Sequence, residues 1–269
     1  MEPCEAVVPA TSNARQFLKL FGVFAWTELL CCLFPIGIFA TLAFTRAVHV
    51  PGVPRYDLIL ICCIAIQWAM VKSKLETLDE LKVICVFHLI GLAMELYKTH
   101  LGSWSYPETA YTKLGTVPLY SGFMYASVAS YMCQGWRRFD LRLERMPAKW
   151  LMISLAAAIY ANFFTNHVLP DVRWILFPAM LFLFSRTVVR FSVAGQRLQM
   201  PMWLSFLLMG FFVWVAENIG TYFSGWRYPR QVHAWELVEV QKISSWALLV
   251  IVSFVLVAWL KSVKDSLRE

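Results

Sequence analysis

The chain has 269 residues, of which 59% are hydrophobic and only 15% are charged. Soluble domains carry about 45–50% apolar and about 25% charged residues, so this composition argues against an ordinary soluble domain. The net charge of +7 fits basic loops that hold a membrane topology, and we expect no nucleic acid as a partner.

The apolar residues form long continuous runs rather than alternating patterns, which favours membrane helices over strands. Residues 1–16 are polar and lack the basic start of a secretory signal, so we expect no leader. Residues 15–25 mix basic and apolar side chains and are expected to lie along the membrane interface. Eight runs follow, at about 22–45, 57–73, 82–101, 117–135, 149–167, 172–191, 201–223 and 242–261. The pattern predicts an all-α polytopic membrane protein with eight transmembrane helices.

The basic residues predict the orientation of these spans. With both termini in the cytoplasm, about two-thirds of the 24 Lys and Arg residues fall in inside segments, most densely in WRRFDLRLER at 136–145. We therefore expect an integral protein of the bacterial cytoplasmic membrane with both ends inside. Seven spans remain an alternative because only a short loop around Pro170 joins the fifth and sixth runs, but the basic 186–197 loop would then lie outside.

An internal repeat relates the two halves of the chain. Glu95-x3-Thr99-x4-Trp104-x-Tyr106-Pro107 recurs as Glu217-x3-Thr221-x4-Trp226-x-Tyr228-Pro229, at one offset of 122 residues. The same offset lays the first four spans over the last four, which predicts two parallel four-helix repeats. The expected divisions are 1–135, a basic cytoplasmic linker at 136–148, and 149–269.

The two motifs carry the candidate chemistry. A carboxylate inside a membrane is unfavourable and normally faces protein or a wet cavity, so Glu95 and Glu217 are the candidate catalytic pair of one outward-opening cavity. Two neighbouring carboxylates raise the pKa of one of them, which suits acid and base roles. The alternative is structural, with each glutamate accepting hydrogen bonds that hold a helix end. The candidate substrate-binding residues are polar or aromatic side chains near the two glutamates, namely His88, Thr99, His100, Trp104, Tyr106, Asn162, His167, Asn218, Thr221, Trp226 and Tyr228.

Several of these residues also have simpler explanations. The Trp and Tyr residues of the motifs are typical interface anchors, and a lone intramembrane histidine is often only a helix-to-helix hydrogen-bond donor. Gly122, Ala126 and Ser130 form a small-residue stripe for helix packing, and Tyr120, Tyr125 and Tyr131 beside it are candidates to line the cavity. The histidines lack tight ligand spacing and the seven cysteines form no CxxC, so we expect no metal and no cofactor.

Five segments carry a family resemblance: ELYKTHLGSWSYPE (95–108), VPLYSGFMYASVASY (117–131), IYANFFTNHVLPDVRW (159–174), AENIGTYFSGWRYP (216–229) and KISSW (242–246). Together they resemble the YoaT-like bacterial integral membrane proteins over residues 70–261. That family has no established biochemical function, so the resemblance implies a membrane setting and leaves the activity open.

A second resemblance is confined to the motif. A glutamate followed by Gly102-Ser-Trp104-Ser-Tyr106 is similar to the membrane carotenoid cyclases and hydratases, although the Pro-x-Glu-Glu pairing of the cyclases is absent. The resemblance to these enzymes implies a polyene lipid as substrate and carboxylates that act as acids. We therefore expect a membrane enzyme or binding protein for a hydrophobic, isoprenoid-like molecule, with membrane lipids as its surroundings. A proton-coupled secondary transporter and a non-catalytic assembly factor are the two alternatives.

Overall fold

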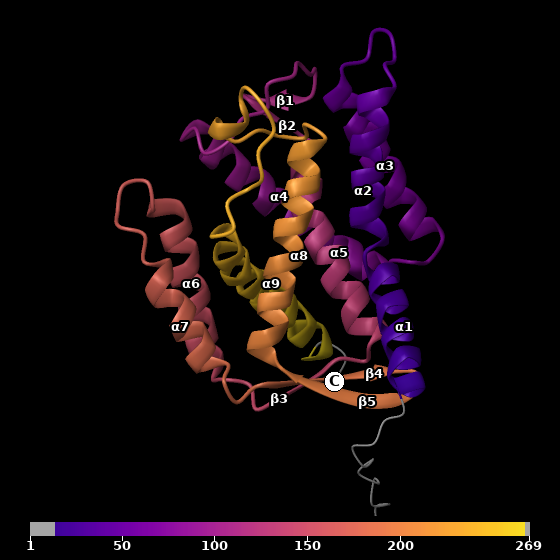
Figure 1. The fold of residues 1–269 in the computed structure, drawn as a ribbon, viewed down its shortest axis with the longest axis vertical. Helices are drawn as coiled ribbons and strands as arrows, with labels where there is room; N and C mark the ends of the chain where they lie inside the picture. The colour runs from indigo at the N-terminus through magenta and orange to yellow at the C-terminus, as the bar shows by residue number, and fades with distance from the viewer. Residues whose placement is uncertain (1–13, 267–269) are drawn as a thin grey trace, which may run out of the picture.

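The structure is a computed structural model that describes residues 14–266, and it consists of helices with two small antiparallel sheets (Figure 1). In chain order its elements are α1 (Ala14–Cys31), α2 (Leu33–Ala47), α3 (Arg55–Lys72), α4 (Leu78–His100), β1 (Lys113–Leu114), β2 (Val117–Pro118), α5 (Ser121–Arg138), β3 (Arg142–Glu144), α6 (Lys149–Thr165), α7 (Arg173–Leu183), β4 (Val188–Val193), β5 (Gln196–Pro201), α8 (Met202–Tyr222), the 3-10 helix η1 (Pro229–Gln231) and α9 (Lys242–Ser266). The predictions that the N-terminus has no leader and that both chain ends are cytoplasmic concern residues outside this range.

The prediction of eight transmembrane helices, and with it that of a multi-pass protein, is wrong. Among the described residues, α8 is the one helix long and apolar enough to cross a membrane, and the pair α1 and α2, bent by 65°, would make at most a second span. At 1.5 Å per residue the 11 residues of α7 reach about 16 Å, well short of a hydrocarbon core of about 30 Å. Helix α4 is long enough, but it carries charged side chains in its first turn and again at Glu95 and Lys98.

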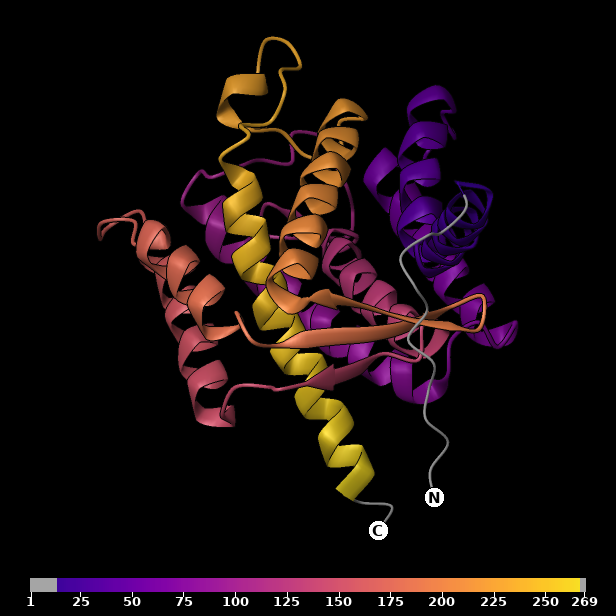
Figure 2. The ribbon, with the colours of Figure 1, turned by 60° about the horizontal axis from the view of Figure 1, so that its bottom comes forward.

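The end of the predicted sixth span forms strands instead of helix. Side chains of β4 alternate between half-buried and buried, as expected for a strand with one face against the core. Ala194 and Gly195 both have positive φ, which is typical of a two-residue hairpin turn, and β5 then returns antiparallel to β4. Strand β3 completes a three-stranded sheet across one end of the helices (Figure 2).

The second half of each predicted repeat is a tightly packed helix pair. Helix α4 packs along α5, and α8 packs along α9. Glycines permit the close approach: a Cβ on Gly91 would lie 2.4 Å from the Tyr125 ring, and one on Gly210 would lie 2.7 Å from the backbone nitrogen of Ala247. These pairs place the ends of α4 and α8, where the motifs begin, close to the starts of α5 and α9. The boundaries of the two repeats stay a prediction.

The end of α8 is held in place from the first half of the chain. The guanidinium of Arg55, at the start of α3, donates to the carbonyl oxygens of Phe223 (2.6 Å) and Ser224 (3.1 Å) and pairs with Glu108 (2.7 Å). The last carbonyls of a helix have no partner within the helix, so a guanidinium satisfies them well. Tyr120, fully buried, also donates its hydroxyl to the Gly225 carbonyl. These contacts join the second motif to α3 and α5.

Candidate functional site

The first candidate glutamate is buried in a cage of hydrogen-bond donors. Glu95 is only 5% exposed, and its Oε2 accepts from Trp104 Nε1 (2.6 Å) and from the Tyr106 hydroxyl (2.8 Å). Its Oε1 accepts from the Tyr125 hydroxyl of α5 (2.9 Å). Gly102 makes this possible, because its φ of +71° ends α4 and turns the chain back toward the helix. The two aromatic residues then follow on alternate positions and reach the same carboxylate.

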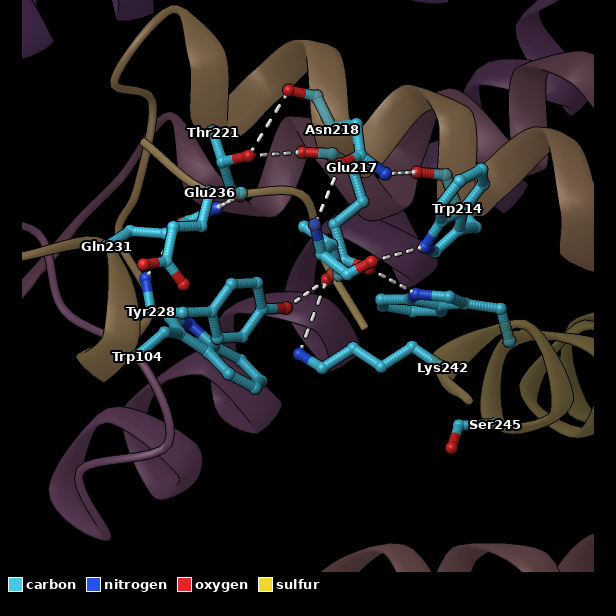
Figure 3. A network of polar contacts seen from close by, with 12 residues as sticks. Trp104, Trp214, Glu217, Asn218, Thr221, Tyr228, Gln231, Glu236, Lys242 and Ser245 are labelled. Carbon is cyan, nitrogen blue, oxygen red and sulfur yellow. Dashed lines mark hydrogen bonds and ion pairs between the residues drawn. The ribbon is translucent and has the colours of Figure 1, made fainter. Parts of the chain in front are cut away.

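The second glutamate repeats this arrangement at the end of α8. Glu217 is 3% exposed and accepts from the Tyr228 hydroxyl and from Trp246 Nε1 of α9 (2.6 Å). Lys242 of α9 places its ammonium 3.8 Å from Glu217 Oε1 (Figure 3). Ser224, with a φ of +56°, turns the chain here as Gly102 does in the first half.

The two motifs meet directly. Ser105 and Arg227 each stand between the Trp and the Tyr of their motif, and their backbones exchange two hydrogen bonds of 2.9 Å in an antiparallel bridge. Across this bridge the Trp104 ring lies edge-on to Tyr228, with ring centroids 6.2 Å apart. Since Trp104 donates to Glu95 and Tyr228 donates to Glu217, the two carboxylates belong to one buried cluster.

The electrostatics reflect this proximity. Burial, together with the negative charge of Glu217, raises the pKa of Glu95 to about 7, although the hydrogen bonds from Trp104, Tyr106 and Tyr125 favour the ionised form. A group with this pKa exchanges its proton near neutral pH, as a general acid or base requires.

This shift predicts a pH dependence of stability. The folded protein holds the Glu95 proton more tightly than the unfolded chain, whose ordinary pKa is 4.5, so the stabilisation is complete below pH 4.5 and declines as the pH rises through about 7. Thermal midpoints measured between pH 4 and pH 8 should therefore fall more steeply for the native chain than for Glu95→Gln, which cannot titrate there. If the thermal midpoints of both proteins changed equally with pH, the raised pKa of Glu95 would be contradicted, because all other titrating groups are the same in the two proteins.

The polar residues beside the glutamates bond to the backbone rather than to the carboxylates. The hydroxyls of Thr99 and Thr221 donate to the main-chain carbonyls of Glu95 (2.7 Å) and Glu217 (3.0 Å). Asn218 donates to the Trp214 carbonyl and accepts from Val238 N, which fastens the segment before α9 onto α8. In this geometry these residues support the helix ends.

The remaining predicted binding residues lie around the cluster rather than in it. His88 packs against Phe123 and approaches Gly122 of α5, while His100 is exposed. Exposed His167 is hydrogen-bonded to Ser103 (3.0 Å). Asn162 holds the α6–α7 turn through Asp171 and Val172 N. Trp226 lies against Gly220, where a Cβ would come within 2.3 Å of its ring.

Two members of the cluster, Lys242 and Trp246, were not among the predicted site residues. Tyr125, a candidate cavity residue, has its counterpart in Trp246, since each is on the helix that packs beside a motif helix and each donates to that helix's glutamate. Their separation of 121 residues is one short of the repeat offset, so a search for the exact offset misses the pair. Among residues 14–266, no three His, Cys, Asp or Glu side chains are grouped as metal ligands would be.

An apolar cavity of about 60 Å³ adjoins the cluster. Tyr125 and Trp246 line it with their rings while their polar atoms bond to Glu95 and Glu217. The rest of the lining comes from α4, α5, α6, α8 and α9, namely Phe87, Ile90, Gly91, Met94, Val128, Tyr160, Val213, Leu249, Val250, Val252, Ser253 and Leu256. Tyr125 and Trp246 therefore contact both the apolar cavity and the two carboxylates that lie behind them.

Comparison with known proteins identifies the family. Residues 20–254 match the family described as "Protein of unknown function (DUF817)". The chain is 57% identical over 248 residues to "Uncharacterized protein YoaT" of Bacillus subtilis (strain 168), covering 92% of this chain and 94% of that protein. No solved structure matches. The chain belongs to the DUF817 family, which confirms the YoaT-like resemblance, whereas the resemblance to carotenoid enzymes stays a prediction.

Proposed function

We propose that this DUF817 protein binds a hydrophobic, isoprenoid-like molecule and presents it to Glu95 and Glu217 as an acid/base pair. One observation carries the proposal: Tyr125 and Trp246 line the apolar cavity and at the same time donate hydrogen bonds to the two glutamates. A ligand that enters the cavity must therefore contact the groups that hold the carboxylates. Because the cavity is small, it accommodates one end of the molecule and the rest extends beyond it.

The pair suits proton transfer to and from a carbon–carbon double bond. Protonated Glu95 gives its proton to one alkene carbon, a C–H bond forms, and the positive charge develops on the other carbon. Glu217, as the base, then removes a proton from a neighbouring carbon and the double bond reforms in a new position, so atoms and electrons balance without a further reactant. The aromatic faces of Tyr125, Trp104 and Trp246 would stabilise the cationic intermediate.

We place this activity at the bacterial cytoplasmic membrane, where such a substrate dissolves. Helix α8 meets the length and hydropathy needed to cross a bilayer, and it exposes Phe211 and Phe212 on its surface. Helix α3 exposes Ile61, Ile64 and Trp68 in the same way. Exposed apolar faces of this kind mark contact with lipid or with partner proteins.

Extraction of the purified protein tests the proposal. We expect protein isolated in mild detergent and extracted with organic solvent to release a defined isoprenoid or polyene, seen in its absorbance spectrum and mass. The Glu95→Gln/Glu217→Gln double variant should release at least tenfold less of it or a chemically altered form, because neither side chain can exchange the proton. Glu144→Gln, on the distant sheet, is the control and should behave as the native chain. Only bulk phospholipid in all three extracts would contradict the proposal.

A further inference from the structure

Three basic side chains gather at the edge of the carboxylate cluster, and we call Lys98, Arg173 and Lys242 the basic cluster; Lys242 belongs to both groups. Lys98 of α4 is only 3% exposed, and its ammonium bonds to the neutral Asn166 Oδ1 (3.1 Å) and lies 4.3 Å from the centre of the Phe163 ring. Within residues 14–266, no carboxylate oxygen comes within 4.0 Å of it. An ammonium has three donors and a buried charge is normally paired, so Lys98 has unused binding capacity.

The other two cations come from α7 and α9, which pack against each other, and Lys98 bonds to the turn between α6 and α7. Arg173 of α7 donates to Ser245 Oγ of α9 (2.8 Å) and pairs with Asp171 (2.8 Å). Burial lowers the pKa of Lys242 to about 8, and the positive charges of Lys98 and Arg173 contribute to that shift. The nearby carboxylates are already engaged, since Asp171 is bound to Arg173 and Glu217 accepts from Tyr228 and Trp246.

The basic cluster continues the walls of the apolar cavity. On α4, Met94 lines the cavity and Lys98 follows one turn later on the same face. On α9, Trp246 lines the cavity and Lys242 precedes it by one turn, because this helix runs the opposite way. Each of these walls thus changes from apolar to cationic at the same end.

We infer that the basic cluster binds the phosphate group of an amphiphile whose apolar chain enters the cavity, an inference that rests on the proposed function and names its substrate class. A phosphate monoester offers three acceptor oxygens and nearly two negative charges to two ammonium groups and one guanidinium. It gives Lys98 a directly bound counter-ion, because Asp171, whose charge acts on Lys98, is already paired with Arg173. The apolar chain of the same molecule then enters the cavity beside Met94 and Trp246.

Binding of three probes to the detergent-purified protein tests this inference: dodecyl phosphate, inorganic phosphate and uncharged dodecanol. By titration calorimetry at pH 7 we expect dodecyl phosphate to bind best, and Lys98→Met to weaken it at least tenfold. Lys82→Met, on the same helix with an exposed side chain, is the matched control and should bind as the native chain does. Without ligand, Lys98→Met should also raise the thermal midpoint by about 2–4 °C, because it removes a buried charge that makes no direct ion pair.

The outcomes separate the two proposals. Failure of both phosphate probes to bind would overturn the basic cluster as a phosphate site, yet a neutral isoprenoid recovered by extraction would still support the proposed function. Equal binding of inorganic and dodecyl phosphate would assign the cluster to free phosphate and overturn its link to the cavity. A Lys98→Met protein that is less stable and binds dodecyl phosphate normally would show a purely structural lysine, against the inference.

Discussion

Replacing Glu217 with alanine is expected to lower the free energy of unfolding by about 3–5 kcal/mol, the usual loss when one partner of a buried charge pair is removed. Glu217 is 3% exposed, and its carboxylate is the acceptor for Tyr228 and Trp246 and the counter-charge for Lys242. Alanine would leave the buried aromatic donors without their acceptor, and an unsatisfied buried group costs about 1–3 kcal/mol, which is part of this loss.

Denaturant unfolding of the purified protein measures this effect against two other variants. Glu217→Gln keeps an acceptor oxygen for the aromatic donors and should lose clearly less stability than the alanine variant. Glu144→Ala removes a half-exposed partner of Arg190 on the sheet and should change the free energy of unfolding by about 0–1 kcal/mol. If Glu217→Ala were no less stable than Glu144→Ala, the buried hydrogen-bond network would not be what holds α8 to α9.

The same three proteins separate the structural role of the glutamate from its chemical role. Glutamine preserves the shape and most of the hydrogen bonding, but it has no titrating proton to give or receive. A Glu217→Gln protein that folds normally and loses its bound ligand would therefore locate the function in the carboxylate. A Glu217→Gln protein that folds normally and keeps its ligand would show that Glu217 serves only to hold the end of α8.

The repeated motif was the most informative part of the sequence, because a fixed offset does not depend on hydropathy. It singled out Glu95, Trp104 and Tyr106 in the first half and Glu217 and Tyr228 in the second, all of which belong to the buried cluster. Trp226, the counterpart of Trp104, packs on Gly220 instead. The partners from α9 were harder to find. Trp246 and Lys242 stand 29 and 25 residues after Glu217, in the KISSW segment, which carries the family resemblance but is not part of the repeated motif. The packing of α8 against α9 brings them to the site.

Hydropathy alone predicted the wrong number of spans. An apolar run does not reveal whether its side chains face lipid or other helices, and the five helices α4, α5, α6, α8 and α9 bury part of their apolar surface around one cavity. The β4–β5 hairpin shows a second reason. Residues 188–193 alternate along the chain, which is typical of a strand, but the predicted sixth span was drawn through Ser185, Arg186 and Thr187 into their valines and so overlooked the alternation.

Introducing a single methyl group at Gly91 is expected to destabilise the protein by about 1–3 kcal/mol, as overpacking of a tight core does. The Cβ of alanine would lie 2.4 Å from Cγ and Cδ2 of Tyr125 and 2.6 Å from its Cβ. Those atoms are near the α5 backbone and cannot swing aside, so α4 and α5 must separate. Separation would also draw the Tyr125 hydroxyl away from Glu95, which it reaches at 2.9 Å.

Gly135→Ala on α5 is the matched control, because the same substitution meets no atom within 4 Å there. Alanine is the better helix former, so this variant should gain about 0.5–1 kcal/mol, and the two glycine variants should differ in sign when unfolded in denaturant. Equal gains at both positions would show that α4 and α5 tolerate a wider spacing than the structure has. Opposite signs, with less ligand recovered from Gly91→Ala, would tie the close helix contact to the position of Tyr125 and hence to the glutamate pair.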